Sequence, residues 1–466
     1  MATSTGQKGP ATQEPLLFTT EMTPDPATQS VPHRMTDDVH IPAERYYSED
    51  FAALEANKLW LRTWQWAARV EDVPHVGDYI VYDVADETAM VVRTDADTIK
   101  VFHNVCPHRA TKLADGCGTF RGGQIVCPFH GWRWKLNGEM SYLYGRHAFD
   151  QEAVADSVVG LKEIRSEIRY GFVWITFDDD AVPFDEFIAP IDKNIAPLAI
   201  ERMRMRWWKY QIVPANWKVA LEAFMEGYHV MQAHPEIAMF RTGDDYNPDS
   251  YKFRYLGNGH TMTASHTPPP GEKRKPAMTG MDFGEWFLEH NRVMFEGTDS
   301  YTTIREEMVA DRIRHRDLED DQIVPSFVQE FRAYCKDAGI ELPPPDPDAA
   351  GFAYVFPNMV FLGTSGNLLF YRVRPHEGDP NQCRYEVFAL QIPTPDNADL
   401  PPVRPQGPLK TSDWPFVLRQ DIENVERQQA GYRSPRFQRA TMSVKYETMI
   451  FGMHNEIDRY LADEQP

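Results

Sequence analysis

Two short segments in the first third of the chain each join a cysteine to a nearby histidine. The stretch NVCPHRATKLADGCGTFRGGQIVCPFHGWRW, residues 104–134, contains Cys106 with His108 and then Cys127 with His130. Thiolate sulfur and imidazole nitrogen are side-chain donors that proteins use for zinc and for iron–sulfur clusters. The stretch therefore predicts a site that holds a metal ion or a cluster.

Three assignments compete for these four side chains. Zinc bound by two cysteines and two histidines would be tetrahedral and structural, but zinc fingers usually pair cysteine with cysteine and histidine with histidine. A disulfide with two idle histidines does not suit a reducing compartment. The third assignment is a two-iron, two-sulfide cluster, with one iron held by two cysteines and the other by two histidines. Each segment offers one cysteine and one histidine, and Pro107, Pro128 and Gly131 suit tight loops, so we expect the cluster.

A second group of potential ligands lies in LEAFMEGYHVMQAHP, residues 221–235. We expect one helix that opens at Asn216 and runs through this stretch. Glu222, Glu226 and His229 are spaced i, i+4 and i+7, so this helix would carry them on one face. Two carboxylates at i, i+4 repel each other, which makes the pattern unfavourable for a helix without a function.

Two histidines and one carboxylate that leave coordination positions open form the facial triad of non-haem Fe(II) oxygenases. His234 lies off the helical face of His229, but Pro235 disfavours helical geometry at the residue before it, so both imidazoles could reach one ion. The carboxylate must come from elsewhere, and we choose Asp421 in RQDIENVERQQAG, with Glu426 as its rival. Two histidines in a helix are by themselves more often ordinary residues; the cluster motif upstream favours the ligand interpretation.

The chain divides into a small β domain and a larger domain of helices laid on an antiparallel sheet, so the fold class is α+β. We place a disordered tail at residues 1–38, the β domain at 39–182 and the second domain at 183–466. The expected strands of the first domain include residues 78–84, 88–94, 98–104 and 170–177, with a hairpin turn at Asn137-Gly138. The expected helices lie at residues 48–64 with Ser48 as N-cap, within 284–340, from Asp413 as N-cap to Gly431, and at 442–462.

Composition excludes several classes of protein. The formal net charge of −21 argues against a nucleic-acid-binding surface. Five cysteines in 466 residues are too sparse for a disulfide framework. No apolar run approaches the roughly 18 residues of a membrane-spanning helix, and the first residues lack the apolar core of a secretory signal. We expect a soluble, cytoplasmic protein without a membrane segment.

The cluster segments resemble the Rieske motif in Cys106-Pro-His108-Arg and Cys127-Pro-Phe-His130-Gly-Trp. Rieske proteins of the cytochrome bc type carry an extra cysteine in each loop, and these two form a disulfide. Here Cys117 is the one extra cysteine, so that bridge cannot form. The resemblance therefore favours the oxygenase and ferredoxin branch over the respiratory branch.

Over residues 40–460 the chain resembles the α subunits of Rieske non-haem iron aromatic-ring-hydroxylating oxygenases. Asn216-Trp-Lys218 and Glu226-x-x-His229-x4-His234 match the catalytic motif of that family. The resemblance implies a [2Fe-2S] cluster on the Rieske domain and a mononuclear Fe(II) in a helix-grip catalytic domain. It implies that His229, His234 and Asp421 bind the iron and that Glu226 is an acid bridging the two metal centres of neighbouring subunits.

The same resemblance implies the partners and the reaction. We expect a homotrimer (α3) or an α3β3 assembly that receives electrons from an NAD(P)H-dependent reductase, directly or through a ferredoxin. The chain would use O2 to mono- or cis-dihydroxylate an aromatic or other cyclic apolar compound. Glu226 stands where many dioxygenases of the naphthalene type have aspartate, and the helix is one residue shorter, as in choline monooxygenase-like and in phenylpropionate dioxygenase-like members. A monooxygenase or demethylase acting on a quaternary ammonium or methoxy compound is therefore the alternative.

Two alternative functions belong to other classes of protein: an electron carrier without oxygenase activity, and a zinc-stabilised binding protein.

The sequence says less about the substrate pocket. The segment HTPPPGEKRKP, residues 266–276, could be a lid or a solvated linker. Seven residues could line an apolar cavity or simply form core: Phe224, Met225, Phe352, Tyr354, Phe356, Phe361 and Phe370.

Overall fold

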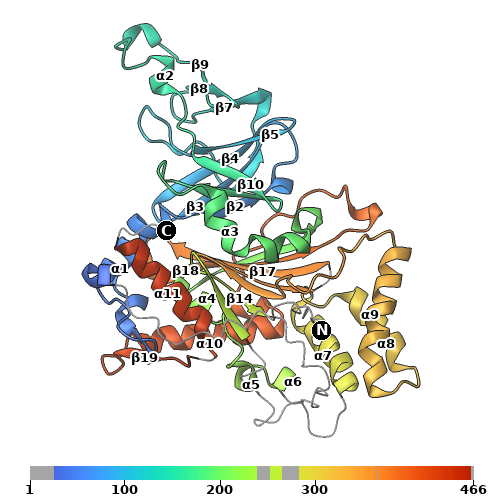
Figure 1. Cartoon of the computed structure of the whole chain (residues 1–466). Coiled ribbons are helices and arrows are strands. Elements are labelled where there is room, and N and C mark those ends of the chain that lie inside the picture. Colours follow the sequence, from blue (N-terminus) through green and yellow to red (C-terminus); the bar gives the residue numbers. More distant parts are fainter. Residues whose placement is uncertain (1–25, 239–251, 265–282, 365, 445, 463–466) are drawn as a thin grey trace, which may run out of the picture.

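The computed structural model of the chain describes residues 26–238, 252–264, 283–364, 366–444 and 446–462. Figure 1 shows two parts, with small sheets at one end and a large twisted sheet flanked by helices at the other. The expected lid, residues 266–276, lies outside the described residues.

The first part is built from three small antiparallel sheets, ordered β5-β4-β3-β6, β7-β8-β9 and β10-β11-β2. The expected strands and the Asn137-Gly138 turn are confirmed. At Gly138 the backbone has φ 87°, and an added Cβ would lie 2.6 Å from the Phe102 ring, so glycine is required there. The strands are β2 (Gln65–Arg69), β3 (Asp78–Val84), β4 (Glu87–Asp95), β5 (Thr98–His103), β6 (Cys117–Thr119), β7 (Gln124–Val126), β8 (Arg133–Lys135), β9 (Met140–Tyr142), β10 (Arg165–Arg169) and β11 (Phe172–Thr176).

The second part is organised around a seven-stranded antiparallel sheet in the order β12-β18-β17-β16-β15-β14-β13. Its strands are β12 (Arg204–Val213), β13 (Lys252–Gly257), β14 (His260–Ala264), β15 (Phe352–Val355), β16 (Met359–Thr364), β17 (Asn367–His376) and β18 (Asp379–Gln391). The longer helices are α3 (Phe184–Ile195), α7 (Phe283–Thr298), α8 (Ile304–Arg314), α9 (Asp320–Asp337), α10 (Phe416–Tyr432) and α11 (Thr448–Leu461). The predicted α+β class, with helices on an antiparallel sheet, is confirmed.

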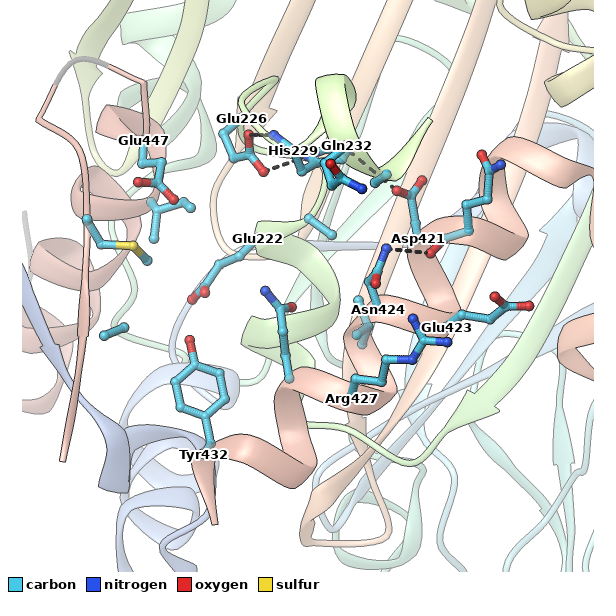
Figure 2. A pocket seen from close by; sticks show the side chains of 18 of the residues that line it. Glu222, Glu226, His229, Gln232, Asp421, Glu423, Asn424, Arg427, Tyr432 and Glu447 are labelled. Carbon is cyan, nitrogen blue, oxygen red and sulfur yellow. Dashed lines mark hydrogen bonds and ion pairs between the residues drawn. The ribbon is translucent and has the colours of Figure 1, made fainter. Parts of the chain in front are cut away.

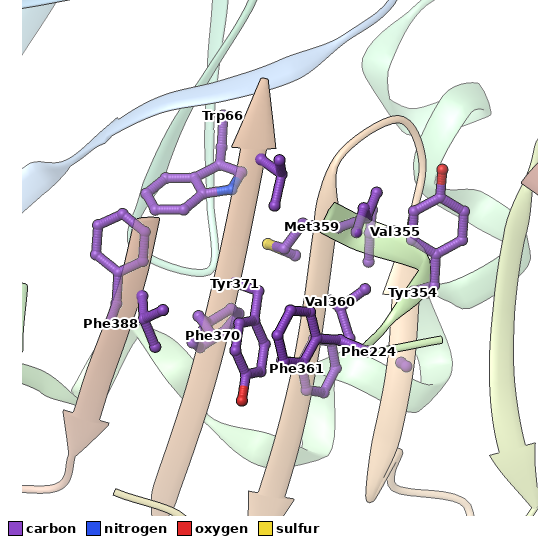
Figure 3. Close-up of a cluster of buried hydrophobic side chains, with 14 of the residues drawn as sticks. Trp66, Phe224, Tyr354, Val355, Met359, Val360, Phe361, Phe370, Tyr371 and Phe388 are labelled. Carbon is purple, nitrogen blue, oxygen red and sulfur yellow. The ribbon is translucent and has the colours of Figure 1, made fainter. Parts of the chain in front are cut away.

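Alternating residues of β17 separate the two faces of this sheet. Phe370 contacts Phe172 of β11, with ring centroids 5.5 Å apart, whereas Tyr371 stacks on Phe224 at 3.9 Å. On the neighbouring strand, Phe388 lies 4.9 Å from Trp66 of β2 (Figure 3). Because successive strand residues point to opposite faces, one face packs against the small β domain and the other faces α4 (Trp217–Glu222).

A buried ion pair reinforces the contact between the two parts. The guanidinium of Arg372 lies 4.1 Å from the Trp66 ring centroid and donates hydrogen bonds to the carbonyls of Trp66 and Ala67. Its Nε donates to Glu386 at 2.8 Å, and neither side chain is more than 1% exposed. A buried ion pair with its hydrogen bonds satisfied fixes how the surrounding elements pack.

Part of the segment that was expected to be a disordered tail has defined structure. Residues Pro26–Ser30 form a short 3-10 helix, and Met35 is buried with its backbone N–H donating to Asp458 of α11 at 2.8 Å. Strand β1 (His40–Pro42) then pairs with β19 (Arg439–Thr441). The expected disordered tail therefore reaches too far along the chain, because an apolar side chain and a buried carboxylate anchor its last residues.

The expected continuous helix after Asn216 is wrong. Asn216 caps α4 as expected, its side chain accepting from Lys218 N at 3.1 Å, but α4 ends at Glu222. The chain becomes helical again only in α5 (Val230–Ala233) and α6 (Pro235–Ala238). Between them the Glu226 carboxylate accepts from the backbone N–H groups of Tyr228 and His229, which replaces helical bonding.

Other helix ends differ by a few residues. Ser48 caps α1 (Glu49–Leu54) as predicted, accepting from Phe51 N at 3.3 Å. Helix α10 begins after Pro415 rather than at Asp413, whose carboxylate instead accepts from Lys410 N. None of the helices in the described part of the chain has both the length and the apolar character needed to cross a bilayer.

Candidate metal centres

The loops that carry the two cysteine–histidine pairs have the same backbone geometry. In each, the cysteine is closed into a tight turn by one hydrogen bond to its carbonyl and one from its N–H. Ala110 (φ 59°) and Gly131 (φ 69°) take the same left-handed conformation at equivalent positions. The bonds are Ala110 N to Cys106 O at 2.9 Å, Cys106 N to Thr111 O at 2.9 Å, Gly131 N to Cys127 O at 3.1 Å and Cys127 N to Trp132 O at 2.8 Å.

These matching turns bring the four predicted side chains together. Cys106 and Cys127 are each 2% exposed, and burial together with the neighbouring Cys127 thiol raises the pKa of Cys106. The rings of His108 and His130 lie 4.7 Å apart between centroids, and His108 stacks on Trp132. Two buried thiols beside two imidazoles are a donor set that fits a cluster with one sulfur-bound and one nitrogen-bound iron. Cys117 is a free cysteine on β6.

The second group of predicted ligands forms a small triangle of donor atoms. His229 Nε2 and His234 Nε2 are 3.2 Å apart, and Asp421 Oδ1 lies 3.4 Å and 3.0 Å from them. Donors about 2.1 Å from one ion and at right angles to each other lie about 3 Å apart, so this triangle fits one face of an octahedron. The ligand atoms of these three residues all lie within 4.8 Å of one another, as the binding of a single metal ion requires.

Local structure explains why the three side chains meet. His234 ends α5 with φ −117° and ψ 72°, a non-helical conformation as expected before Pro235. Asp421 comes from the middle of α10, which packs against α4 and α5. Its rival Glu426 points elsewhere and accepts a hydrogen bond from Thr411.

Each imidazole is oriented by a second hydrogen bond at its other nitrogen. His229 Nδ1 lies 2.5 Å from Glu226 Oε1, and His234 Nδ1 lies 2.8 Å from Gln420 Oε1. Gln420 is held in turn by Glu236, which accepts from its amide at 2.7 Å. With Nδ1 donating in both rings, both Nε2 atoms are free to bind a metal, an arrangement typical of histidine ligands.

The charges of the triangle are strongly coupled. Burial lowers the pKa of His229, but hydrogen bonds to Asp421 and Glu226 outweigh it and raise this pKa to about 10. Burial likewise opposes the shift at His234, whose pKa is nevertheless raised by Asp421. Burial opposes the shift at Asp421, but the hydrogen bonds and the positive charge of both histidines together lower its pKa. The site thus stabilises positive charge at the centre of the triangle, where a cation would bind.

Two cavities meet at the triangle. A cavity of about 400 Å³ is lined by His229, His234 and Asp421 and otherwise mostly by apolar and aromatic side chains. A second, more polar cleft of about 940 Å³ is lined by His229 and Asp421 together with Glu226 and Glu222 (Figure 2). The metal site therefore faces an apolar chamber on one side and a polar cleft on the other.

Most of the seven residues named as cavity candidates belong to the hydrophobic core. Phe224 and Phe352 line the 400 Å³ cavity. The other five are buried within the sheet and its helices and do not line it: Met225, Tyr354, Phe356, Phe361 and Phe370.

Comparison with known families agrees with both sites. Residues 200–463 match the family described as ring hydroxylating alpha subunit (catalytic domain), and residues 63–148 match the Rieske [2Fe-2S] domain. The chain belongs to this family of Rieske oxygenase α subunits. A Rieske cluster and a mononuclear iron are the cofactors typical of the family, and both donor sets fit them.

Among individual proteins, the chain is similar to two monooxygenase subunits. It is 29% identical over 213 residues to the glycine betaine monooxygenase oxygenase subunit of Chromohalobacter salexigens, covering 45% of this chain and 46% of that protein. It is 27% identical over 223 residues to the carnitine monooxygenase oxygenase subunit of Escherichia coli, covering 47% and 57%. The matches thus span about half the length of these relatives.

Solved structures share the fold over nearly the whole chain. A naphthalene 1,2-dioxygenase with indole bound in the active site superposes with a TM-score of 0.64 at 16% identity, covering 92% of this chain and 93% of that one. The quaternary ammonium Rieske monooxygenase CntA with a bound inhibitor gives 0.60 at 18%, covering 91% and 95%.

Sequence reasoning missed the residues that orient the ligands from neighbouring positions. Gln420 adjoins Asp421 on α10, yet both reach His234. Adjacent helical residues point in different directions, so spacing carries no signal for such a pair. Tyr46 and His454, which hold Glu222, come from segments far apart in the sequence and also carry no local signal.

Proposed function

We propose that this chain is the terminal oxygenase of a Rieske system, with iron held by His229, His234 and Asp421. The observation that carries the proposal is the triangle of donor atoms opening onto a cavity of about 400 Å³. Iron bound there would supply oxygen activation next to a substrate held in the cavity. The protein holds the ligands: Glu226 and Gln420 keep both histidines turned toward the ion.

In this proposal Cys106, His108, Cys127 and His130 hold the cluster that receives electrons from an NAD(P)H-dependent reductase, directly or through a ferredoxin. In Figure 1 the sheet β7-β8-β9, which adjoins the cluster loops, and helix α5 lie at opposite ends of the molecule. Transfer within one subunit would thus cross most of the protein. A trimer, in which one subunit's cluster reaches its neighbour's cleft at Glu226, supplies the shorter route. We also propose that the Rieske domain ends at residue 182 and that the catalytic domain begins at residue 183.

As substrate class we propose a quaternary ammonium compound, oxidised by a monooxygenase reaction. The names of the two relatives above support this class. Phe224, Phe352 and Tyr371 line the cavity, and aromatic rings attract quaternary ammonium groups.

A neutral aromatic compound is the second candidate, and the cavity wall favours it. None of the described residues that line the cavity is lysine or arginine, and its walls are mostly apolar. A carboxylate-bearing substrate such as carnitine would find no lysine or arginine side chain among them to pair with.

One substrate panel separates these candidates. Purified chain, loaded with iron and cluster and reduced by a surrogate reductase, is assayed for substrate-dependent O2 uptake and hydroxylated product. Choline, glycine betaine and carnitine represent quaternary ammonium compounds without and with a carboxylate; indole and naphthalene represent neutral aromatics. We expect turnover with choline above the other two ammonium compounds. Turnover with indole or naphthalene alone would make neutral aromatic compounds the substrate class in place of quaternary ammonium compounds. No turnover with any of these compounds would contradict the oxygenase proposal.

A further inference from the structure

Glu222 is a buried acid that lines the cleft at the metal site and has no role in the proposed function. It ends α4, is 7% exposed, and lines the 940 Å³ cleft together with Glu226, His229 and Asp421. Exposed residues, among them Arg427, line the same cleft, so it communicates with solvent. Figure 2 shows the Glu222 carboxyl group in the space between Glu226 and Tyr432.

Two side chains hold the carboxyl group in place. The hydroxyl of Tyr46 donates to it, 3.1 Å from both oxygens, and His454 Nε2 lies 2.8 Å from Oε1. His454 is fully buried, and its Nδ1 has no hydrogen-bond partner among the described residues. A hydrogen on Nδ1 would be buried and unpaired, so the ring carries its hydrogen on Nε2 and donates it to Glu222.

The open side of the Glu222 carboxyl group is the cleft. Tyr46 and His454 both donate to the carboxylate, and the remaining space that the group lines is the cleft. Glu222 can therefore exchange its proton with water in the cleft.

The surrounding charges let Glu222 keep a proton near neutral pH. The nearby cations are already neutralised: Lys218 pairs with Glu55 at 2.7 Å, and Arg45 pairs with Asp458 at 2.6 Å. Burial raises the pKa of Glu222 to about 8, against the hydrogen bond from Tyr46 and the charge of Lys218. The titratable and charged groups around it, from every element packed there, are Arg45, Tyr46, Glu55, Lys218, Tyr354, Tyr432, Glu447 and His454.

We propose that Glu222 is the proton donor of the metal site, passing its proton to water in the cleft that it shares with His229 and Asp421. This inference rests on the proposed oxygenase function, because hydroxylation with O2 consumes protons and electrons in equal number. The carboxyl O–H bond breaks as its proton passes to a water of the cleft, which hands a proton on toward the metal site. The carboxylate, still bonded to Tyr46 and His454, then regains a proton from a hydronium ion or a protonated buffer molecule of the solvent, which is left as water or as the conjugate base, and no electron moves.

The test compares Glu222→Gln with a matched control, Glu456→Gln, in the full-length protein carrying both metals. Glu456 is a buried acid on α11 that accepts from Tyr255, and burial raises its pKa, but it does not line the cleft. We expect Glu222→Gln to keep iron content and cluster spectrum while substrate-dependent O2 consumption falls on the order of 10²-fold, as for loss of a general acid. Added imidazole buffer, a small diffusible acid, should restore part of the rate, and Glu456→Gln should resemble the wild type.

An infrared titration of the metal-depleted protein supplies a readout independent of turnover. The wild type should show a carboxylic C=O band that disappears as pH rises through about 8, and Glu222→Gln should lack it. In Tyr46→Phe the carboxylate loses a donor, so the band should persist to higher pH. Absence of a titrating band, or a Glu222→Gln variant with normal turnover, would overturn the inference. A wild type that shows the band but oxidises no substrate would overturn the proposed function instead.

Discussion

Oδ1 of Asp421 lies 3.0 Å from Nε2 of His234, although Asp421 lies on α10 and His234 follows α5, far away in the sequence. The contact joins a carboxylate with a lowered pKa to an imidazole with a raised one, so in the absence of a metal a proton occupies the position of the cation. A divalent ion would displace that proton and keep the same geometry.

Asp421→Asn should therefore remove the mononuclear iron and abolish turnover while the Rieske cluster remains. The matched control is Glu426→Gln on the same helix, whose carboxylate accepts from Thr411 instead of facing the triangle. Iron analysis together with the visible and EPR spectra of the cluster checks both. If Glu426→Gln lacks iron and Asp421→Asn retains it, the third iron ligand is Glu426 and not Asp421.

Cys106→Ser or His130→Ala should eliminate the Rieske absorbance and leave the catalytic iron site loadable, because each removes one cluster ligand. Cys117→Ser should keep the normal spectrum, since Cys117 lies on β6 outside both turns. A normal Rieske spectrum in either of the first two variants would show that the four-ligand assignment is wrong.

Glu226→Gln should retain both metals and assemble normally but lose most substrate-dependent O2 consumption. The amide keeps the size of the side chain but removes the charge that binds His229 and, in the proposed trimer, His130 of the neighbour. In single-turnover experiments the cluster should be reduced quickly and re-oxidised slowly. The control is Glu423→Gln, because Glu423 is an exposed acid that lines the same polar cleft as Glu226. In this variant the cluster should be re-oxidised at the wild-type rate. Equal rates in the two variants would leave Glu226 with a structural role.

His260 should make the fold sensitive to mild acid. Its ring is fully buried, with Nε2 2.8 Å from Phe187 O and Nδ1 accepting from Phe356 N, and burial lowers its pKa to about 4. At a pH between the ordinary histidine pKa and the lowered pKa of His260, this side chain is protonated in the unfolded chain but not in the folded one. Stability is therefore lost as pH falls from about 6.5 to about 4, by about 3 kcal/mol from this group.

His260→Gln should be less stable than the wild type at pH 7, because it cannot make both hydrogen bonds. The difference should shrink as pH falls, since the variant has no imidazole to protonate. Urea unfolding of both proteins across this range measures the difference, and a constant gap would contradict the assignment.

The parts of the site that follow from local chemistry could be predicted from the sequence. Cysteine and histidine two or three residues apart indicate a cluster loop, and Pro235 indicates that His234 leaves the helix. The break after Glu222 could not be predicted, because it depends on the Glu226 carboxylate bonding to the backbone ahead of it.

For the fold, too, local sequence predicts some features, whereas others depend on contacts between distant residues. Strands β3 to β5 lie where β-branched alternation predicts them. Whether an aromatic residue faces the cavity depends on sheet register: Tyr371 faces α4 and the cavity, whereas its neighbour Phe370 packs against the small β domain. Gln420, Tyr46 and His454 act through contacts between distant segments, which a single sequence does not reveal.

The packing of Trp66 and Arg372 between the two parts of the chain bears on how electrons travel. Paired domains move relative to each other unless their interface is large and apolar, and here ring contacts and a buried ion pair make the junction continuous with the core. We therefore expect no hinge that swings the cluster toward the iron of its own chain. In the proposed trimer, the association of the subunits then sets the route between the centres, and dilution to monomers should stop turnover without altering either metal's spectrum.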